Sequence, residues 1–257
     1  MKKISIFIIT FLFSTMTFAQ EVGLPRNQLF VGPELYKVKR EKEFGSKQEG
    51  DLIGCRLGYQ RLKRYNIYVG IDFLYASGRL EGRAGPNRLH SVLKDINLEE
   101  RIGYTLESRC WWHASLTPFV GAGNFWEKNH YQHPSPLKVH FDNSFSYATA
   151  GFLASIRPWE QLLVGVNFKV RYLWRGFIKV SHDPDMDDHT IFYEERIQYR
   201  VEIPLTYYFV YQWHLVGIDL TPFYELRPYG HRANYPFDFL KTTYKLYGAT
   251  LKFIYLF

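Results

Sequence analysis

The chain has 257 residues, a formal net charge of +7 at pH 7, two cysteines and an aromatic content of 18%. Charged and apolar residues are too evenly balanced for a disordered chain, and two cysteines exclude a disulfide-rich scaffold and a four-cysteine zinc site. The basic residues are spread along the chain without a long run, so nucleic acid is not an expected partner.

The N-terminal segment has the features of a secretory signal peptide. Basic residues at 2–3 precede an apolar run at 4–13 and a small-x-small cleavage signal that ends at Ala19. The run is too short to span the ~30 Å hydrocarbon core of a bilayer as a helix. We therefore predict a signal peptide at 1–19 and one exported domain at 20–257. No later segment has the ~18 consecutive apolar residues of a membrane helix, so this domain is either soluble or a β-barrel.

A Val-Gly pair recurs five times along the exported domain at intervals of 38 to 52 residues. Such regular recurrence indicates repeated supersecondary units. Long polar connections alternate with short ones, which is the asymmetry between external loops and periplasmic turns in an outer-membrane barrel. Five units of two strands each predict ten strands. The long connections are expected at about 41–50, 81–95, 131–140, 181–190 and 229–240.

Apolar and polar residues alternate strictly along three long segments, 162–175, 194–209 and 215–227. Strict alternation predicts strands, and the lengths suffice for the ~9–11 residues with which a tilted strand crosses a bilayer. A soluble two-sheet sandwich fits less well, because the polar face carries bulky Arg and Glu and aromatic residues lie near both ends of the apolar face. We predict an all-β fold, a ten-stranded antiparallel up-and-down transmembrane β-barrel.

The last predicted strand alternates from Tyr247 to the terminal Phe257. Together with the signal peptide and the repeats, this ending resembles the Gram-negative outer-membrane β-barrel superfamily, in a ten-stranded form of omptin size. The resemblance implies an outer-membrane location among lipid and lipopolysaccharide, and it implies that the barrel-assembly machinery reads Phe257. Size, aromatic-rich strands and basic composition also resemble the small porin-like outer-membrane proteins of chlamydia-like bacteria, which implies passive solute exchange.

Alternation also predicts which residues face the lumen. The glycines of the Val-Gly pairs are expected at one height, where they relieve curvature and are compatible with a vestibule on the periplasmic side. This glycine ring consists of Gly32, Gly70, Gly121, Gly165 and Gly217. One step outward we expect a charge ring made of Glu34, Arg56, Asp72, Arg101, Glu202 and Asp219. Further basic residues expected in the lumen are Lys169, Arg171, Arg175, Arg196 and Arg200.

These charges are expected to fill most of the lumen. Opposite charges on neighbouring strands attract, and a barrel of about eight strands encloses only side chains. At most a narrow, water-threaded path is expected through ten strands, with a mild preference for anions.

An Asp-x-His pair, Asp187 and His189, lies in the fourth long connection and is similar to the Asp-x-His of omptins, which are outer-membrane proteases. The resemblance implies that the aspartate orients a histidine that activates water. The second long connection lacks the spaced acidic pair that omptins also need, and we expect the strands to stop short of the tall omptin extension. Other catalytic motifs are absent from the sequence, and no metal or cofactor is expected.

Together these features favour an outer-membrane barrel without catalysis, either a porin-like path for small solutes or a structural surface protein. Two alternatives stay open, an omptin-like endopeptidase and an adhesin that uses loop aromatics such as Tyr131, Tyr235 and Phe237. Cys55 and Cys110 fall on strands that are not adjacent, so no internal disulfide is expected. The solute and the oligomeric state do not follow from the sequence.

Overall fold

The computed structural model describes residues 27–43, 45–62, 66–108, 113–136, 138–184, 187–192, 196–230 and 241–257. The predicted signal peptide, Cys110, Tyr235 and Phe237 lie outside this part of the chain. Among the described residues, no helix is long and apolar enough to cross a membrane. The described strands are β1 (Gln28–Lys42), β2 (Lys47–Arg61), β3 (Asn66–Ala84), β4 (Asn87–Glu107), β5 (Ser115–Tyr131), β6 (His140–Trp159), β7 (Leu162–Ser181), β8 (His189–Phe192), β9 (Arg196–Glu202), β10 (Leu205–Tyr211), β11 (His214–Tyr229) and β12 (Thr242–Leu256).

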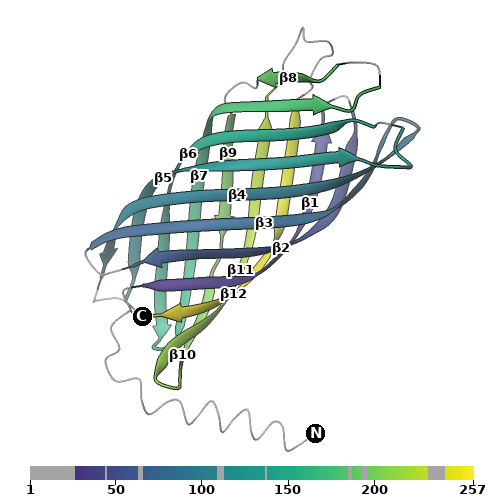
Figure 1. Ribbon diagram of the computed structural model, residues 1–257. Coiled ribbons are helices and arrows are strands. Elements are labelled where there is room, and N and C mark those ends of the chain that lie inside the picture. Colours follow the sequence, from purple (N-terminus) through teal and green to yellow (C-terminus); the bar gives the residue numbers. More distant parts are fainter. Residues whose placement is uncertain are drawn as a thin grey trace, which may run out of the picture.

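The strands form one antiparallel sheet that closes into a barrel, because β1 pairs with β2 on one side and with β12 on the other (Figure 1). β9 and β10 make up a single wall strand, since both pair with β7 and β11 in one continuous register. The break between them includes Pro204, which has no N–H to donate to the ladder. β8 pairs with β7 in the same register as β9, so it continues this wall strand. The wall therefore has ten strands, as predicted.

Both described ends of the chain meet at one end of the barrel. Asn27 and Phe257 exchange backbone hydrogen bonds of 3.2 and 3.1 Å. We call this the periplasmic end, following the up-and-down topology with short turns on that side. The opposite end, near β8 in Figure 1, is called the outer end.

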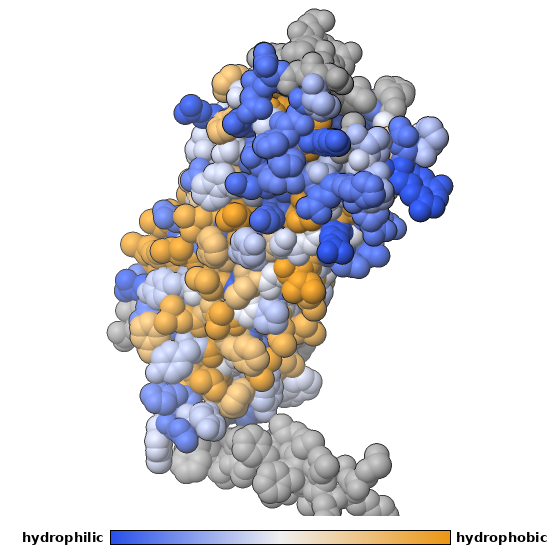
Figure 2. Space-filling model, turned by 45° about the vertical axis from the view of Figure 1, so that its right-hand side comes forward, coloured by the Kyte–Doolittle hydropathy of each residue, from blue (hydrophilic) through white to orange (hydrophobic). Residues whose placement is uncertain are grey.

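On the face shown in Figure 2, apolar side chains gather over the lower part of the wall and polar side chains over the outer end. Exposed apolar side chains lie on strands all around the wall, so they form a belt. Leu35, Ile53 and Val120 expose 54%, 67% and 59% of their surface. A closed barrel pairs all its backbone hydrogen-bonding groups internally, as the interior of a lipid bilayer requires. A large exposed apolar belt is unfavourable in water and favourable in lipid. The apolar face of the strands therefore points outward into lipid, and the predicted transmembrane barrel is confirmed.

The wall extends well beyond the bilayer at the outer end. β4 has 21 residues and β6 and β7 have 20 each, about twice the ~9–11 residues that a membrane crossing needs. β3 and β4 are joined by a tight turn at Gly85-Pro86, where Gly85 has a φ of +59°. The expectation that the strands stop short was therefore wrong, as was the expected loop at 81–95. Outside the membrane both faces of a strand can be polar, so alternation of hydropathy no longer marks it.

The interior has three layers. An apolar cluster with Phe30 and Tyr208 lies at the periplasmic end, and a larger cluster with Phe125, Tyr147 and Phe223 lies toward the outer end. Between them the inward positions of neighbouring strands carry buried acids and bases. This middle layer is the most unusual feature of the lumen and is the candidate site.

Candidate functional site: a charged plug across the lumen

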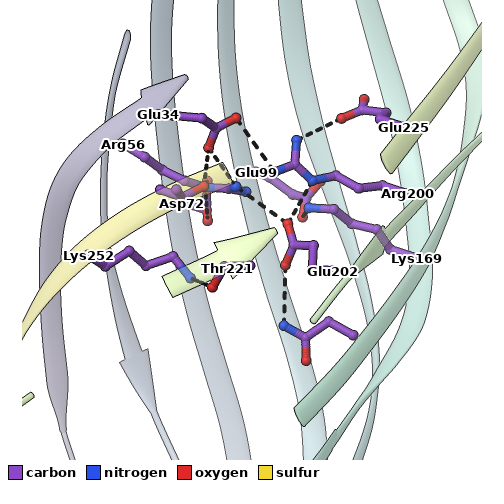
Figure 3. Close-up of polar contacts among 12 residues, drawn as sticks. Glu34, Arg56, Asp72, Glu99, Lys169, Arg200, Glu202, Thr221, Glu225 and Lys252 are labelled. Carbon is purple, nitrogen blue, oxygen red and sulfur yellow. Dashed lines mark hydrogen bonds and ion pairs between the residues drawn. The ribbon is translucent and has the colours of Figure 1, made fainter. Parts of the chain in front are cut away.

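Arg56 lies at the centre of the first cluster of buried charges. Its Nε lies 2.9 Å from Asp72 Oδ1, and its Nη1 lies 3.0 Å from Glu34 Oε2 and 3.4 Å from Glu202 Oε1 (Figure 3). β1, β2 and β3 are neighbours, but Glu202 comes from β9 on another part of the wall. The planar guanidinium therefore joins three carboxylates, and it does so across the lumen.

Arg200 extends this cluster toward the outer end. Its Nε donates to Glu202 Oε1 at 2.7 Å and its Nη1 donates to Glu225 Oε2 at 2.8 Å. Its guanidinium also lies over the ring of Phe223, with the carbon atom Cζ 3.8 Å from the ring centroid. This cation–π contact joins the charged layer to the apolar cluster above it.

A second cluster is built around Glu99. Its carboxylate accepts hydrogen bonds from Lys169 Nζ at 2.9 Å, from Arg171 Nε at 3.1 Å and from the Tyr147 hydroxyl at 3.0 Å. Arg101 adds a contact of 3.5 Å to Glu99 and another of 3.5 Å to Asp72, so the two clusters are continuous.

Arg227 closes the network on the outer side. It lies 2.6 Å from Glu225 and 3.0 Å from Asp95, which also accepts a hydrogen bond of 2.8 Å from the Tyr36 hydroxyl. Arg171 reaches the same Glu225 at 2.6 Å.

We call this network the charged plug. It contains six carboxylates and six cations, so it is neutral overall, and no member's side chain is more than 9% exposed. Desolvation offsets much of the attraction in buried ion pairs, but removing one partner leaves an uncompensated charge. The plug therefore acts as one unit. Its members are Glu34, Asp72, Asp95, Glu99, Glu202, Glu225, Arg56, Arg101, Lys169, Arg171, Arg200 and Arg227.

Most of the predicted charge ring lies in this plug. Asp219 does not share its contacts: it pairs with Lys252 at 3.0 Å and accepts hydrogen bonds from Thr206 and Thr221, closer to the periplasmic end. The basic residues Lys169, Arg171 and Arg200 are buried and belong to the plug. Arg196 begins β9, and its side chain lies outside the described part.

The predicted inward orientation of Arg175 was wrong, because the structure leaves its side chain exposed. β6 and β7 pair Tyr147 with Leu173 but Ser146 with Arg175, so Trp174 is an extra residue on β7. Such a β-bulge shifts the alternation by one residue. Arg175 consequently faces outward next to Trp174, which is 48% exposed.

The glycine ring faces inward, but it does not empty the lumen. A Cβ atom at Gly70 would overlap the hydroxyl of Tyr68, and one at Gly217 would lie 2.9 Å from the Tyr208 ring. At these two positions aromatic side chains occupy the space that the glycines leave, whereas at Gly32 and Gly121 the backbone of the neighbouring strand comes closest. A cavity of about 110 Å³ does lie at the periplasmic end, bordered by residues such as Gln28, Phe30 and Tyr208.

The described residues proposed for an endopeptidase or an adhesin lie at the outer end of the barrel. The Nδ1 atom of His189 lies 3.0 Å from the backbone oxygen of Asp187. Tyr131, expected in an exposed loop, is only 5% exposed at the end of β5, and its hydroxyl donates to Gln48 at 3.0 Å. That expectation was wrong, because Tyr131 takes an inward position and helps to close the outer end.

Several plug residues were not singled out as site residues from the sequence. Asp95 falls within the loop predicted at 81–95, because the polar outer part of β4 shows no hydropathy alternation. Glu99, Glu225 and Arg227 lie at inward positions of their strands, but strand alternation cannot show which residues meet across the lumen. The excess of Arg and Glu on inward positions was the available signal.

No family model and no curated protein matches the chain. Among solved structures, the chain is similar to the outer membrane protease OmpT from Escherichia coli, with a TM-score of 0.57 and 13% identity over 93% of this chain and 100% of that chain. The transport unit of the autotransporter AIDA-I from Escherichia coli matches with a TM-score of 0.47 and 9% identity, over 98% of this chain and 97% of that chain. At such low identity, the similarity to OmpT shows a shared fold and nothing about activity. The chain has the fold of omptin-sized outer-membrane β-barrels, and the apolar belt around its closed wall makes it an integral protein of the outer membrane.

Proposed function

We propose that the protein is a sealed outer-membrane barrel that serves as a structural surface protein, without an open pore and without catalysis. The observation that carries this proposal is the charged plug, whose cross-lumen contacts join Arg56 to Glu202 at 3.4 Å and Lys169 to Glu99 at 2.9 Å. A porin-like path would need these ion pairs to part for every solute. Separating them would leave buried charges without their partners, so passive flow through the plug is disfavoured.

The layers on both sides of the plug support the same function. Stacked rings of Phe125 and Phe145, with centroids 5.5 Å apart, lie on its outer side, and Tyr229 stacks on Phe145 at 5.1 Å. Farther out, Arg40 donates to Gln48 on the neighbouring strand β2 and to Tyr131 of β5 across the lumen. Two closures in series, one ionic and one aromatic, are unlike the wide lumen of a pore.

Planar-bilayer recordings on the folded barrel test this function. We expect no conductance steps above background from the wild type. The charge-balanced double variant Glu99→Ala/Lys169→Ala removes a cross-lumen pair and should produce steps. The control Glu41→Ala/Lys245→Ala removes a pair of the same 2.9 Å spacing from the exposed surface and should stay silent. Steps in the wild type would refute the sealed barrel, and the channel function would replace it.

The rim gives less support to an omptin-like endopeptidase. The contact between Asp187 and His189 involves the backbone oxygen of Asp187 and not its carboxylate. This contact therefore does not provide the orienting carboxylate that a catalytic histidine uses. The tall outer extension and the fold shared with OmpT are compatible with both a structural protein and an endopeptidase. Neither feature supplies the acidic pair that omptins need on the opposite rim.

A further inference from the structure

Three imidazole rings are stacked at the outer end of the barrel. His130 lies near the end of β5, His140 begins β6, and His182 directly follows β7. The ring centroids of His130 and His140 are 4.1 Å apart with an interplanar angle of 8°, and those of His140 and His182 are 4.3 Å apart. His130 and His140 are direct partners in the ladder, so the arrangement is built on the wall itself.

Hydrogen bonds hold the two outer rings of the stack in place. His130 Nε2 lies 2.9 Å from Asp142 Oδ1, and His182 Nδ1 lies 3.2 Å from Ser181 Oγ. Because an ionised carboxylate accepts but does not donate, His130 carries its proton on Nε2 when its ring is neutral, and its Nδ1 keeps a lone pair. A carboxylate that holds the distal N–H of an imidazole is the usual support of a metal-binding histidine.

His182 reaches the stack through an unusual backbone conformation. Its φ is +63°, in the left-handed region that residues other than glycine seldom occupy. The ladder pairs His140 with Ser181, so regular alternation would turn residue 182 to the opposite face. The left-handed conformation instead brings the ring of His182 over that of His140. Conformations of this kind persist where surrounding contacts support them, and they are concentrated at functional positions.

The site is accessible to an ion, since the side chains of His130 and Asp142 are 31% and 36% exposed.

We propose that His130, His140 and His182 form a surface chelate for a divalent transition-metal ion of the type that prefers imidazole ligands, such as Zn²⁺. Within the described ranges, no three His, Cys, Asp or Glu side chains are already arranged to hold a metal ion, because the rings lie face to face. Binding therefore turns the rings about their side-chain torsions until their lone pairs converge on the ion, while Asp142 keeps its hold on His130. This site is independent of the charged plug and of the proposed function.

Calorimetric titration of the full folded barrel with Zn²⁺ tests the proposal, using protein without an affinity tag in a buffer that does not bind zinc. At pH 7.5 we expect one high-affinity equivalent. His140→Gln should lower the affinity at least tenfold, and His130→Gln and His182→Gln should each lower it. His90→Gln is the matched control: His90 also lies toward the outer end, beside Glu81 at 3.8 Å, but it has no part in the stack. A mobility shift between boiled and unboiled samples verifies that each variant is folded.

Loss of binding in the three stack variants, with binding kept in His90→Gln, would support the chelate. Unchanged binding in His140→Gln, or an equal loss in His90→Gln, would overturn it and indicate nonspecific binding by surface histidines. Absence of a high-affinity equivalent in the wild type would also overturn it. Because imidazole must be neutral to bind a metal ion, the affinity for Zn²⁺ should fall between pH 7.5 and pH 5.5. An affinity that stays the same over this range would contradict histidine ligation.

Discussion

The ammonium nitrogen of Lys169 lies 2.9 Å from Glu99 Oε1, although the two residues are 70 positions apart and their strands, β7 and β4, are separated by two others in the wall. The contact therefore crosses the lumen and does not merely join neighbouring strands. Both side chains are at most 5% exposed. A ten-stranded barrel is narrow enough for one long side chain to span from wall to wall, which is why the interior charges act as a plug.

The substitution Glu99→Gln should lower the free energy of unfolding by about 3–5 kcal/mol, because it leaves Lys169 and Arg171 facing each other without the buried carboxylate between them. Urea titration of the barrel in lipid vesicles measures this loss. Glu41→Gln removes a carboxylate at the same 2.9 Å distance from an exposed lysine and should leave unfolding unchanged, since solvent screens that pair. Equal losses in the two variants would mean that burial of the plug contributes nothing.

The strands of the wall could be predicted from sequence because lipid on one side and packed polar side chains on the other enforce strict alternation. Val31 and Glu34 follow this rule, and the structure exposes the former and buries the latter. The rule fails at Arg175, because the bulge at Trp174 adds a residue that no hydropathy pattern records. The rule also fails above the membrane. There Leu80 and Leu89 point inward between polar neighbours, and the hydropathy pattern of a strand does not differ from that of a loop.

The membership of the plug was less predictable than its existence. Alternation identifies Glu202 and Arg56 as inward-facing, but their contact joins residues 146 positions apart and depends on barrel diameter, strand stagger and side-chain reach together. None of these quantities can be read from one strand. Pairs on adjacent strands, such as Glu34 and Arg56, were within the reach of sequence reasoning, whereas cross-lumen pairs were not.

Acidification should loosen the outer end near the histidine stack. The pKa of His140 is lowered in the folded state relative to its unfolded value of 6.5, so between these two values the unfolded state binds more protons. Stability contributed by the neutral ring is thus present at higher pH and is lost as pH falls from 6.5 toward the folded pKa. Amide protection factors at the ends of β5 and β6 should decrease over this window in the wild type. They should change less in His140→Gln, and an identical response would assign the effect to other groups.

The terminal Phe257 should matter more for assembly than for the finished barrel. Its ring is 55% exposed and stacks on Tyr255 at a centroid distance of 6.0 Å, so few native contacts depend on it. If the assembly machinery reads this residue, Phe257→Ala should reduce the heat-modifiable form in cell envelopes several-fold, while purified variant refolds in vitro like the wild type. Leu251→Ala is a suitable control, since it changes another lipid-facing residue of β12. Equal amounts of the heat-modifiable form in envelopes from the wild type and Phe257→Ala would argue against Phe257 as an assembly signal.

Peptide cleavage should be absent in the wild type and equally absent in Asp187→Asn and His189→Ala. The backbone carbonyl of Asp187 holds the imidazole, and this bond does not supply the negative charge that a water-activating histidine needs in its transition state. A basic fluorogenic peptide incubated with the folded barrel in lipopolysaccharide-containing micelles provides the measurement. Turnover by the wild type that disappears in both variants would establish the endopeptidase and remove the non-catalytic function.

Gly70→Ala tests whether glycine is needed at this position to accommodate the side chain of Tyr68. Its new methyl group would overlap the hydroxyl of Tyr68, a residue that is fully buried, two positions earlier on the same face of β3. Overpacking of this kind costs about 1–3 kcal/mol, which urea titration can resolve. Tyr68→Phe removes the overlapping oxygen, so the double variant Tyr68→Phe/Gly70→Ala should recover much of the loss. A double variant as unstable as the sum of its single changes would show that the two residues do not interact, and curvature of the backbone would then be the reason for Gly70.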